Sequence, residues 1–127
     1  MADSIFTKII RGEVPSYKIY EDDKTFVFLT IEPTQPGQAL VVPKKQVDQL
    51  WDLSEKDYQA VMATVKKVAQ RLRQVLKVER VAVRVIGEEV PHAHVHLIPI
   101  SSAEDFYHKA YVASQSELAE MAKRLAF

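Results

Sequence analysis

Histidines are the residues of this chain that are best placed to do chemistry, because three of its four histidines lie in one short run. The run reads VPHAHVHLIPI, and it puts His92, His94 and His96 at alternate positions. Successive side chains of an extended backbone point to opposite faces, so the three imidazoles would share one face at spacings of ~6.5–7 Å. The residues between the histidines and after them would face the core: Ala93, Val95 and Leu97.

Phosphoryl chemistry is one use for such a row. Neutral imidazole is a nucleophile and a proton carrier, while neighbouring imidazoles can donate hydrogen bonds to phosphate oxygens. A row of solvated histidines and a zinc site are the alternatives. His92 and His96 would lie ~13–14 Å apart on a straight strand, so all three rings cannot easily reach one ion, although two of them with a distant ligand could. We expect the fourth histidine, His108 in FYHKAYV, to face water.

Composition narrows the class of protein. The chain has 127 residues, a formal net charge of zero and no cysteine. We therefore expect one domain (residues 1–127), no disulfide or thiolate metal site, and no long-range attraction to nucleic acid. No apolar run reaches membrane-spanning length and the start lacks the features of a signal peptide, so the expected location is the cytoplasm. Glycine occurs only at positions 12, 37 and 87, so the chain has no glycine-rich phosphate-binding loop.

The elements that must position the histidines follow from periodicity and capping signals. Asp3 or Ser4 can cap a short helix that ends at Gly12, and Ser54 precedes a long amphipathic helix with apolar residues at spacings of three and four. A capping pattern at Ser114 begins a final helix. Five strands are predicted: 17–22, 25–31, 38–43, 80–86 and 92–100. This order predicts an α+β fold, a mainly antiparallel sheet of about five strands with helices covering one face.

Several motifs together resemble one family. PHAHVHLIP matches the His-φ-His-φ-His-φ-φ pattern (φ apolar) of the histidine triad, or HIT, superfamily of nucleotide hydrolases and transferases. IFTKIIRGEVPSYKIYEDD is similar to the start of the purine-nucleoside phosphoramidase branch, and PGQALVVPKKQ resembles that branch's PGHxLVIPKxH. GEEVPH stands where GQ[S/T]VxH is expected. The resemblance is strongest over residues 5–100.

The resemblance implies a function and a role for each histidine. His94 would attack the α-phosphorus of a nucleoside phosphoramidate or related conjugate, and water would hydrolyse the covalent nucleotidyl-imidazole. The backbone carbonyl of His92 would hold the Nδ1 proton of His94, and His96 would contact the phosphate and assist the leaving group. Apolar residues would wall the base pocket, although pattern alone assigns them to the core: Ile5, Phe6 and Phe28. The resemblance implies no metal or other cofactor, and it suggests a homodimer.

This chain departs from the family pattern around the nucleotide. Gln38 and Gln46 replace histidines, and Thr30 stands where an aspartate would bind the ribose. The loop before GEEV is short, and Glu88 and Glu89 replace an amide and a hydroxyl. Carboxylates next to a phosphate repel it, so we expect this pair either to face solvent or to receive a cationic part of the substrate, for instance an amine on the leaving group.

Three hypotheses follow from these residues. The first is a nucleotidyl hydrolase acting through His94, with Thr30, Gln38 and the acidic pair among the groups that bind substrate. The second is a nucleotide-binding protein with weak or no turnover, which the changes at Gln38 and Thr30 favour. The third is a zinc-binding module. Neither the base preference nor the leaving group follows from the sequence.

Overall fold

The computed structural model describes residues 2–127 and contains one five-stranded sheet in the order β1-β2-β3-β5-β4. All four neighbouring pairs are antiparallel, which confirms the predicted α+β fold. The elements are α1 (Ile5–Ile10), β1 (Lys18–Glu21), β2 (Thr25–Leu29), β3 (Ala39–Pro43), the short 3₁₀ helix η1 (Leu50–Asp52), α2 (Glu55–Leu76), β4 (Arg80–Arg84), β5 (Val95–Ile100), α3 (Ala103–Phe106) and α4 (Gln115–Leu125).

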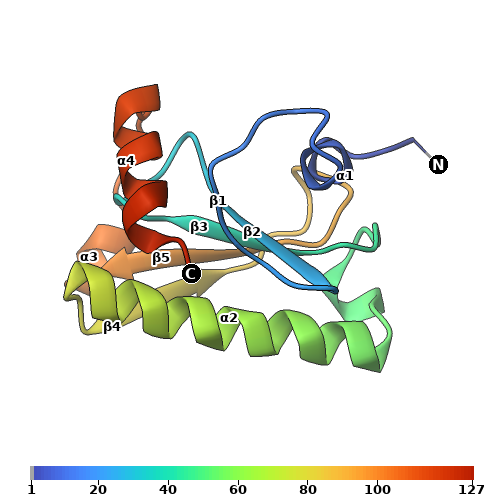
Figure 1. Ribbon diagram of the computed structural model, residues 1–127. Coiled ribbons are helices and arrows are strands. Elements are labelled where there is room, and N and C mark those ends of the chain that lie inside the picture. The colour runs from blue at the N-terminus through green and yellow to red at the C-terminus, as the bar shows by residue number, and fades with distance from the viewer. Residues whose placement is uncertain (1) are drawn as a thin grey trace.

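The long helix α2 runs along one face of the sheet, and α4 packs beside it (Figure 1). Ser54 caps α2, its hydroxyl accepting a hydrogen bond from the backbone N–H of Asp57. The buried stripe of α2 repeats every three or four residues: Val61, Thr64, Val65, Val68 and Leu72. It meets the sheet residues that point to this side, which are Val27, Leu29, Ala39, Val41, Val95 and Leu97. This is the larger of two cores.

The short helix α1 lies on the opposite face of the sheet. The alternate residues of β2 and β3 form a second core there with Phe6 and Ile9 of α1: Phe26, Phe28, Leu40 and Val42. The expectation that helices cover one face therefore holds for α2 and α4 and is wrong for α1. Its position has a functional consequence, because Leu40 pairs with His96 across the β3–β5 ladder. The histidines accordingly lie on the α1 side of the sheet.

The fifth strand begins later than the sequence predicts. It starts at Val95, and the backbone N–H of Ala93 donates to Val47 O rather than to a strand partner. His92 and His94 therefore precede the strand, in an extended segment. The alternation survives, since Ala93, Val95 and Leu97 are in the larger core. The rings, however, are buried and not solvated, with His92, His94 and His96 only 0%, 4% and 7% exposed.

Gly37 fixes the approach to β3. Its φ of +89° lies in the left-handed region, and a Cβ there would come within 2.7 Å of the Leu76 side chain at the end of α2. The left-handed backbone favours glycine, and a larger residue would also have to displace the end of the Leu76 side chain. Gln38 comes next, immediately before β3, and its amide reaches His96 on the side of the sheet that holds the histidines.

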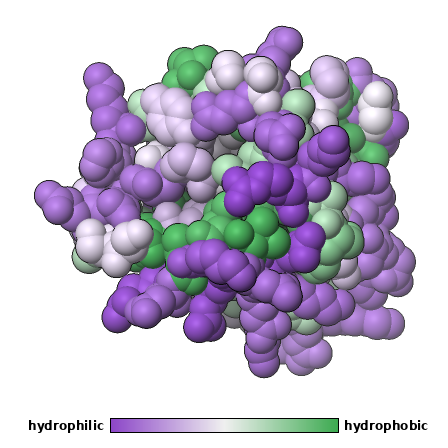
Figure 2. All heavy atoms as spheres, turned by 60° about the vertical axis from the view of Figure 1, so that its left-hand side comes forward, coloured by the Kyte–Doolittle hydropathy of each residue, from purple (hydrophilic) through white to green (hydrophobic). Residues whose placement is uncertain are grey.

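One end of the molecule has a mostly polar surface. Figure 2 shows the end of the molecule that carries α3 and α4, where hydrophilic side chains surround a central group of hydrophobic ones. His108, which follows α3, is exposed as expected. None of the described helices has the length and apolar character needed to cross a membrane.

Candidate functional site

A cavity of about 490 Å³ opens between α1, the ends of β2 and β3, and the histidine segment. Of the residues singled out from the sequence, it brings together Ile5, Phe6, Phe28, Thr30, Glu89, His94 and His96. Three others do not line it. His92 is buried behind it, Gln38 lies behind His96, and Glu88 is exposed outside it, so the assignments of Gln38 and Glu88 as direct substrate contacts are not supported by their positions.

The apolar wall of the cavity is also the smaller core. Phe6 meets Phe28 edge to face at 5.4 Å between ring centroids, and it meets the His94 ring in the same way at 5.1 Å. Ile5, which is 44% exposed, extends this wall toward solvent. The core interpretation is therefore confirmed for Phe6 and Phe28 and is wrong for Ile5, and all three side chains line the cavity. Phe6 also holds the His94 ring in place.

His92 links α1 to the end of β3. Its Nε2 lies 2.7 Å from the carbonyl oxygen of Pro43, which can only accept, so Nε2 carries the proton. Its Nδ1 then accepts from the Ser4 hydroxyl at 2.7 Å. Ser4 is at the same time the N-cap of α1, because its Oγ accepts from the N–H of Thr7 at 3.0 Å. Burial lowers the pKa of His92, and the ring is neutral.

Gln46 completes this network, although the sequence marked it only as a lost histidine. Its Oε1 accepts from the backbone N–H of Ser4 at 2.8 Å and from the Thr7 hydroxyl at 2.7 Å, while its Nε2 donates to the carbonyl of Ala2. The amide therefore ties the segment after β3 to α1. Nothing in the local pattern around Ser4 or Thr7 indicates a contact some 40 residues away.

His94 is held as a nucleophile would be. Its Nδ1 donates to the backbone carbonyl of His92 at 2.8 Å, so its Nε2 is unprotonated in the neutral ring. The ring is 4% exposed and lines the cavity. Phe6 packs against the ring, and Nε2 lies 3.8 Å from a carboxylate oxygen of Glu89, which also lines the cavity.

His96 has the opposite tautomer, and Gln38 determines it. The backbone N–H of Thr34 can only donate, and it meets Gln38 Oε1 at 2.8 Å. The amide nitrogen of Gln38 must therefore face His96 Nδ1, at 3.1 Å, and donate to it. The proton of neutral His96 is then on Nε2, and no described residue accepts it. Burial first, and then the charge of Arg84, lower the pKa of His96 to about 4.

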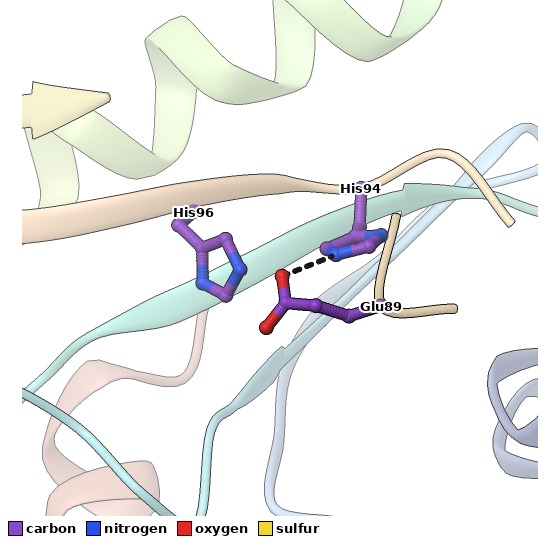
Figure 3. A group of neighbouring side chains, drawn as sticks. All are labelled: Glu89, His94 and His96. Carbon is purple, nitrogen blue, oxygen red and sulfur yellow. Dashed lines mark ion pairs between the residues drawn. The ribbon is translucent and has the colours of Figure 1, made fainter. Parts of the chain in front are cut away.

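Glu89 closes the cavity beside the two histidines (Figure 3). One carboxylate oxygen lies 3.8 Å from His94 Nε2, and one potential ligand atom each of Glu89, His94 and His96 lie within 4.8 Å of one another. The cluster has the donor types of a metal site. However, the Nε2–H of His96 points toward it, so an ion would meet a proton in place of a lone pair.

Comparison with known proteins agrees with this architecture. A family model described as the HIT domain matches residues 11–103. An uncharacterized HIT-like protein of Borreliella burgdorferi is 37% identical over 106 residues, covering 78% of this chain and 76% of that protein. The adenosine 5′-monophosphoramidase hnt1 of Schizosaccharomyces pombe is 34% identical over 101 residues, covering 79% and 76%. A solved HIT-like protein from Bartonella henselae has a TM-score of 0.85 at 31% identity, covering 97% and 94%.

Proposed function

Since this chain belongs to the HIT family, we propose that it is a nucleotide hydrolase that attacks the α-phosphorus of a nucleoside phosphoramidate or related conjugate through His94. The observation that carries the proposal is the hydrogen bond from His94 Nδ1 to the carbonyl of His92. It leaves an uncharged nitrogen lone pair at the edge of an apolar cavity large enough for a nucleoside.

The proposed reaction has two steps. First, Nε2 of His94 bonds to the α-phosphorus while the bond from phosphorus to the leaving group breaks. The electron pair of that bond departs with the leaving group, and a leaving amine takes a proton from solvent. Second, a water oxygen bonds to phosphorus, the phosphorus–Nε2 bond breaks, and the electron pair returns to His94. The water loses one proton to solvent, and the nucleoside monophosphate is released. The Nε2–H of His96 is placed to stabilise negative charge on the phosphoryl oxygens.

The cavity wall suggests how the nucleoside is held. Ile5, Phe6 and Phe28 supply apolar surface for a base. Thr30 also lines the cavity, and its Oγ already accepts a weak contact from the N–H of Glu32 at 3.3 Å, so its hydroxyl proton is available to a ribose oxygen. No cofactor is required by this scheme.

Glu89 is proposed to select for positive charge. Its carboxylate is next to the reacting nitrogen and would repel a phosphate unless a cation shared the site. An ammonium group on the leaving group would supply that cation. Lysine-bearing and neutral-amine adenylates test this idea: faster hydrolysis of the lysine compound, with the preference lost in Glu89→Gln and kept in Glu88→Gln, is expected. Equal rates for the two compounds would remove it.

The direct test of the function is hydrolysis of an adenosine phosphoramidate. AMP should form, the His94→Ala variant should lose at least about a thousandfold in rate, and mass spectrometry of the quenched reaction should find AMP on the peptide that contains His94. AMP formation that survives in His94→Ala, or an adduct elsewhere, would refute the proposal.

A nucleotide-binding protein without turnover is the second candidate. Thr30 in place of a carboxylate and the lost imidazole at Gln38 favour it, and it predicts thermal stabilisation by AMP with no hydrolysis of any conjugate. A zinc module is the third candidate, and metal analysis of untagged protein tests it.

We also propose that the protein is a homodimer located in the cytoplasm. Its ligand is proposed to be a small nucleotide and not a nucleic acid. The absence of cysteine and the zero net charge support the location and the ligand class. Support for the dimer comes from β4, an outer strand of the sheet, where Val83 is 50% exposed and Ile86 just beyond it is 53% exposed. Sedimentation equilibrium should give twice the chain mass of 14.5 kDa, and the chain mass itself would contradict the dimer.

A further inference from the structure

His96 is held in a way that prevents it from giving up a proton. Gln38 donates a hydrogen bond to its Nδ1, and Gln38 itself cannot turn over, because its Oε1 accepts from both the N–H and the hydroxyl of Thr34, at 2.8 and 3.2 Å. Both Gln38 and Thr34 are buried, at 2% and 7% exposure. Flipping the amide would set its NH₂ group against the Thr34 N–H and leave two donors facing each other without an acceptor.

The chemical consequence concerns the proton on Nε2. If neutral His96 released it, the ring would become an imidazolate anion, unless Nδ1 gained a proton at the same moment. Nδ1 faces the N–H of Gln38, which has no proton to give and cannot accept one. The doubly protonated ring is disfavoured as well, since Nδ1–H would then oppose an N–H donor and Arg84 lies alongside. Of the groups around the ring, the carboxylate of Glu89 favours its positive charge by sign, whereas Arg84 and His94 oppose it.

We propose that Gln38 makes His96 a fixed hydrogen-bond donor instead of a general acid, and that the site consequently prefers nucleotide conjugates whose leaving group departs without a proton. Such groups are carboxylates and acidic phenolates joined through oxygen to the α-phosphorus. This inference rests on the proposed function of His94. It makes Gln38 a positioning residue that sets specificity through His96.

The reaction with an oxygen leaving group needs no general acid. Nε2 of His94 bonds to phosphorus, the phosphorus–oxygen bond breaks, and the oxygen leaves as a stable anion with the electron pair. An alkylamine leaves a phosphoramidate in the same way only if its nitrogen gains a proton, and His96 does not supply one. Well-positioned general acids contribute about 10²–10⁴-fold to a rate, so that is the scale of the expected penalty on amines.

The tautomer can be tested without any turnover. Long-range ¹H–¹⁵N NMR of protein labelled at histidine should show His96 protonated on Nε2 and His94 on Nδ1, at neutral pH. In Gln38→Glu, a carboxylate would accept from Nδ1, so His96 should gain a proton there, and Thr34→Val, which keeps the backbone N–H, should leave the tautomer of His96 as it is. A wild-type His96 protonated on Nδ1 would overturn the inference.

The specificity can be tested with a series of adenosine 5′-phosphate aryl esters of graded phenol acidity and one alkylamine phosphoramidate. We expect kcat/KM to fall steeply with falling leaving-group acidity in the wild type. The Gln38→His variant places a proton carrier next to Nδ1 of His96. It should raise kcat/KM for the alkylamine phosphoramidate, relative to kcat/KM for the nitrophenyl ester of the series, by about 10²-fold. A flat wild-type dependence, or a ratio that Gln38→His leaves unchanged, would refute the inference.

Failure of this inference can be told from failure of the proposed function. A flat leaving-group dependence with an AMP adduct on His94 removes the role of Gln38 alone. Loss of the adduct, or activity that survives in His94→Ala, removes the nucleophile and with it the whole scheme. Should Gln38→His not fold, the wild-type series and the NMR measurement still decide the question.

Discussion

Replacing Ser4 with alanine is the sharpest test of the network that supports the histidines. The Ser4 hydroxyl accepts from the N–H of Thr7 as the N-cap of α1 and donates to the Nδ1 of His92, and the residue is 5% exposed. The substitution therefore removes the N-cap of α1 and also leaves the buried Nδ1 of His92 without a hydrogen-bond donor.

The expected cost has two parts. Loss of an N-cap costs about 1 kcal/mol, and a buried group without its partner costs about 1–3 kcal/mol more. The Thr7 hydroxyl lies 3.4 Å from the same nitrogen, but its proton is donated to Gln46 Oε1, so it does not replace the lost donor. We expect the free energy of unfolding to fall by about 2–4 kcal/mol, which for a chain of this size lowers Tm by roughly 6–16 °C.

The chain offers a matched control in Ser114, the N-cap of α4, whose Oγ accepts from the N–H of Glu117 at 3.0 Å in an exposed setting. Ser114→Ala loses only a cap, so urea unfolding should show a loss of about 1 kcal/mol. The difference between the two variants measures the bond to His92. Ser4→Ala should also lower kcat/KM more than Ser114→Ala, since a loosened His92 no longer fixes the carbonyl that orients His94. Equal losses of stability in the two variants would refute the reasoning.

Three further outcomes are expected. In the folded protein the pKa of His96 is lowered to about 4 from 6.5. Its contribution to stability is therefore complete above pH 6.5 and is lost as the pH falls toward 4. In urea titrations at a series of pH values, His96→Asn should reduce the stability lost on acidification by on the order of 2 kcal/mol, and an unchanged dependence of stability on pH would contradict this. Phe6→Ala should destabilise the protein by about 3 kcal/mol, measured by thermal unfolding, because it removes a buried ring that packs against both Phe28 and His94. Glu89→Gln should tighten AMP binding by about tenfold in calorimetry while Glu88→Gln does not, since only Glu89 lies in the cavity; the same gain in both would argue against a local effect.

Most of the fold could be predicted from the sequence because its signals are local. Ser54 and Ser114 are capping residues where the helices begin, and the apolar period of α2 defines its buried face. The placement of α1 could not be predicted, because its four apolar residues fit either face of a sheet. What decides the face is the alternation in β2 and β3, which exposes Phe26 and Phe28 on the side away from α2 and leaves them to be covered.

The candidate site divides in the same way. The histidine run could be found from its type and spacing, and the tautomer of His94 was implied by the family resemblance. The partners of His92 and His96 could not be found, since Ser4, Gln38 and Gln46 reach them from distant parts of the chain. Gln38 shows why a missing imidazole is hard to interpret from sequence alone. In the sequence it is only a replaced histidine. In the structure its amide determines which nitrogen of His96 holds the proton.

The bond between His92 and the cap of α1 has a consequence for how the molecule breaks down. The larger core, between α2, α4 and the sheet, contains no residue of α1, whereas the reactive face needs that helix to seat His92. Limited proteolysis in the loop between α1 and β1 would therefore leave a fragment that is still compact and resistant to further digestion but inert. Catalysis would vanish before circular dichroism recorded any unfolding.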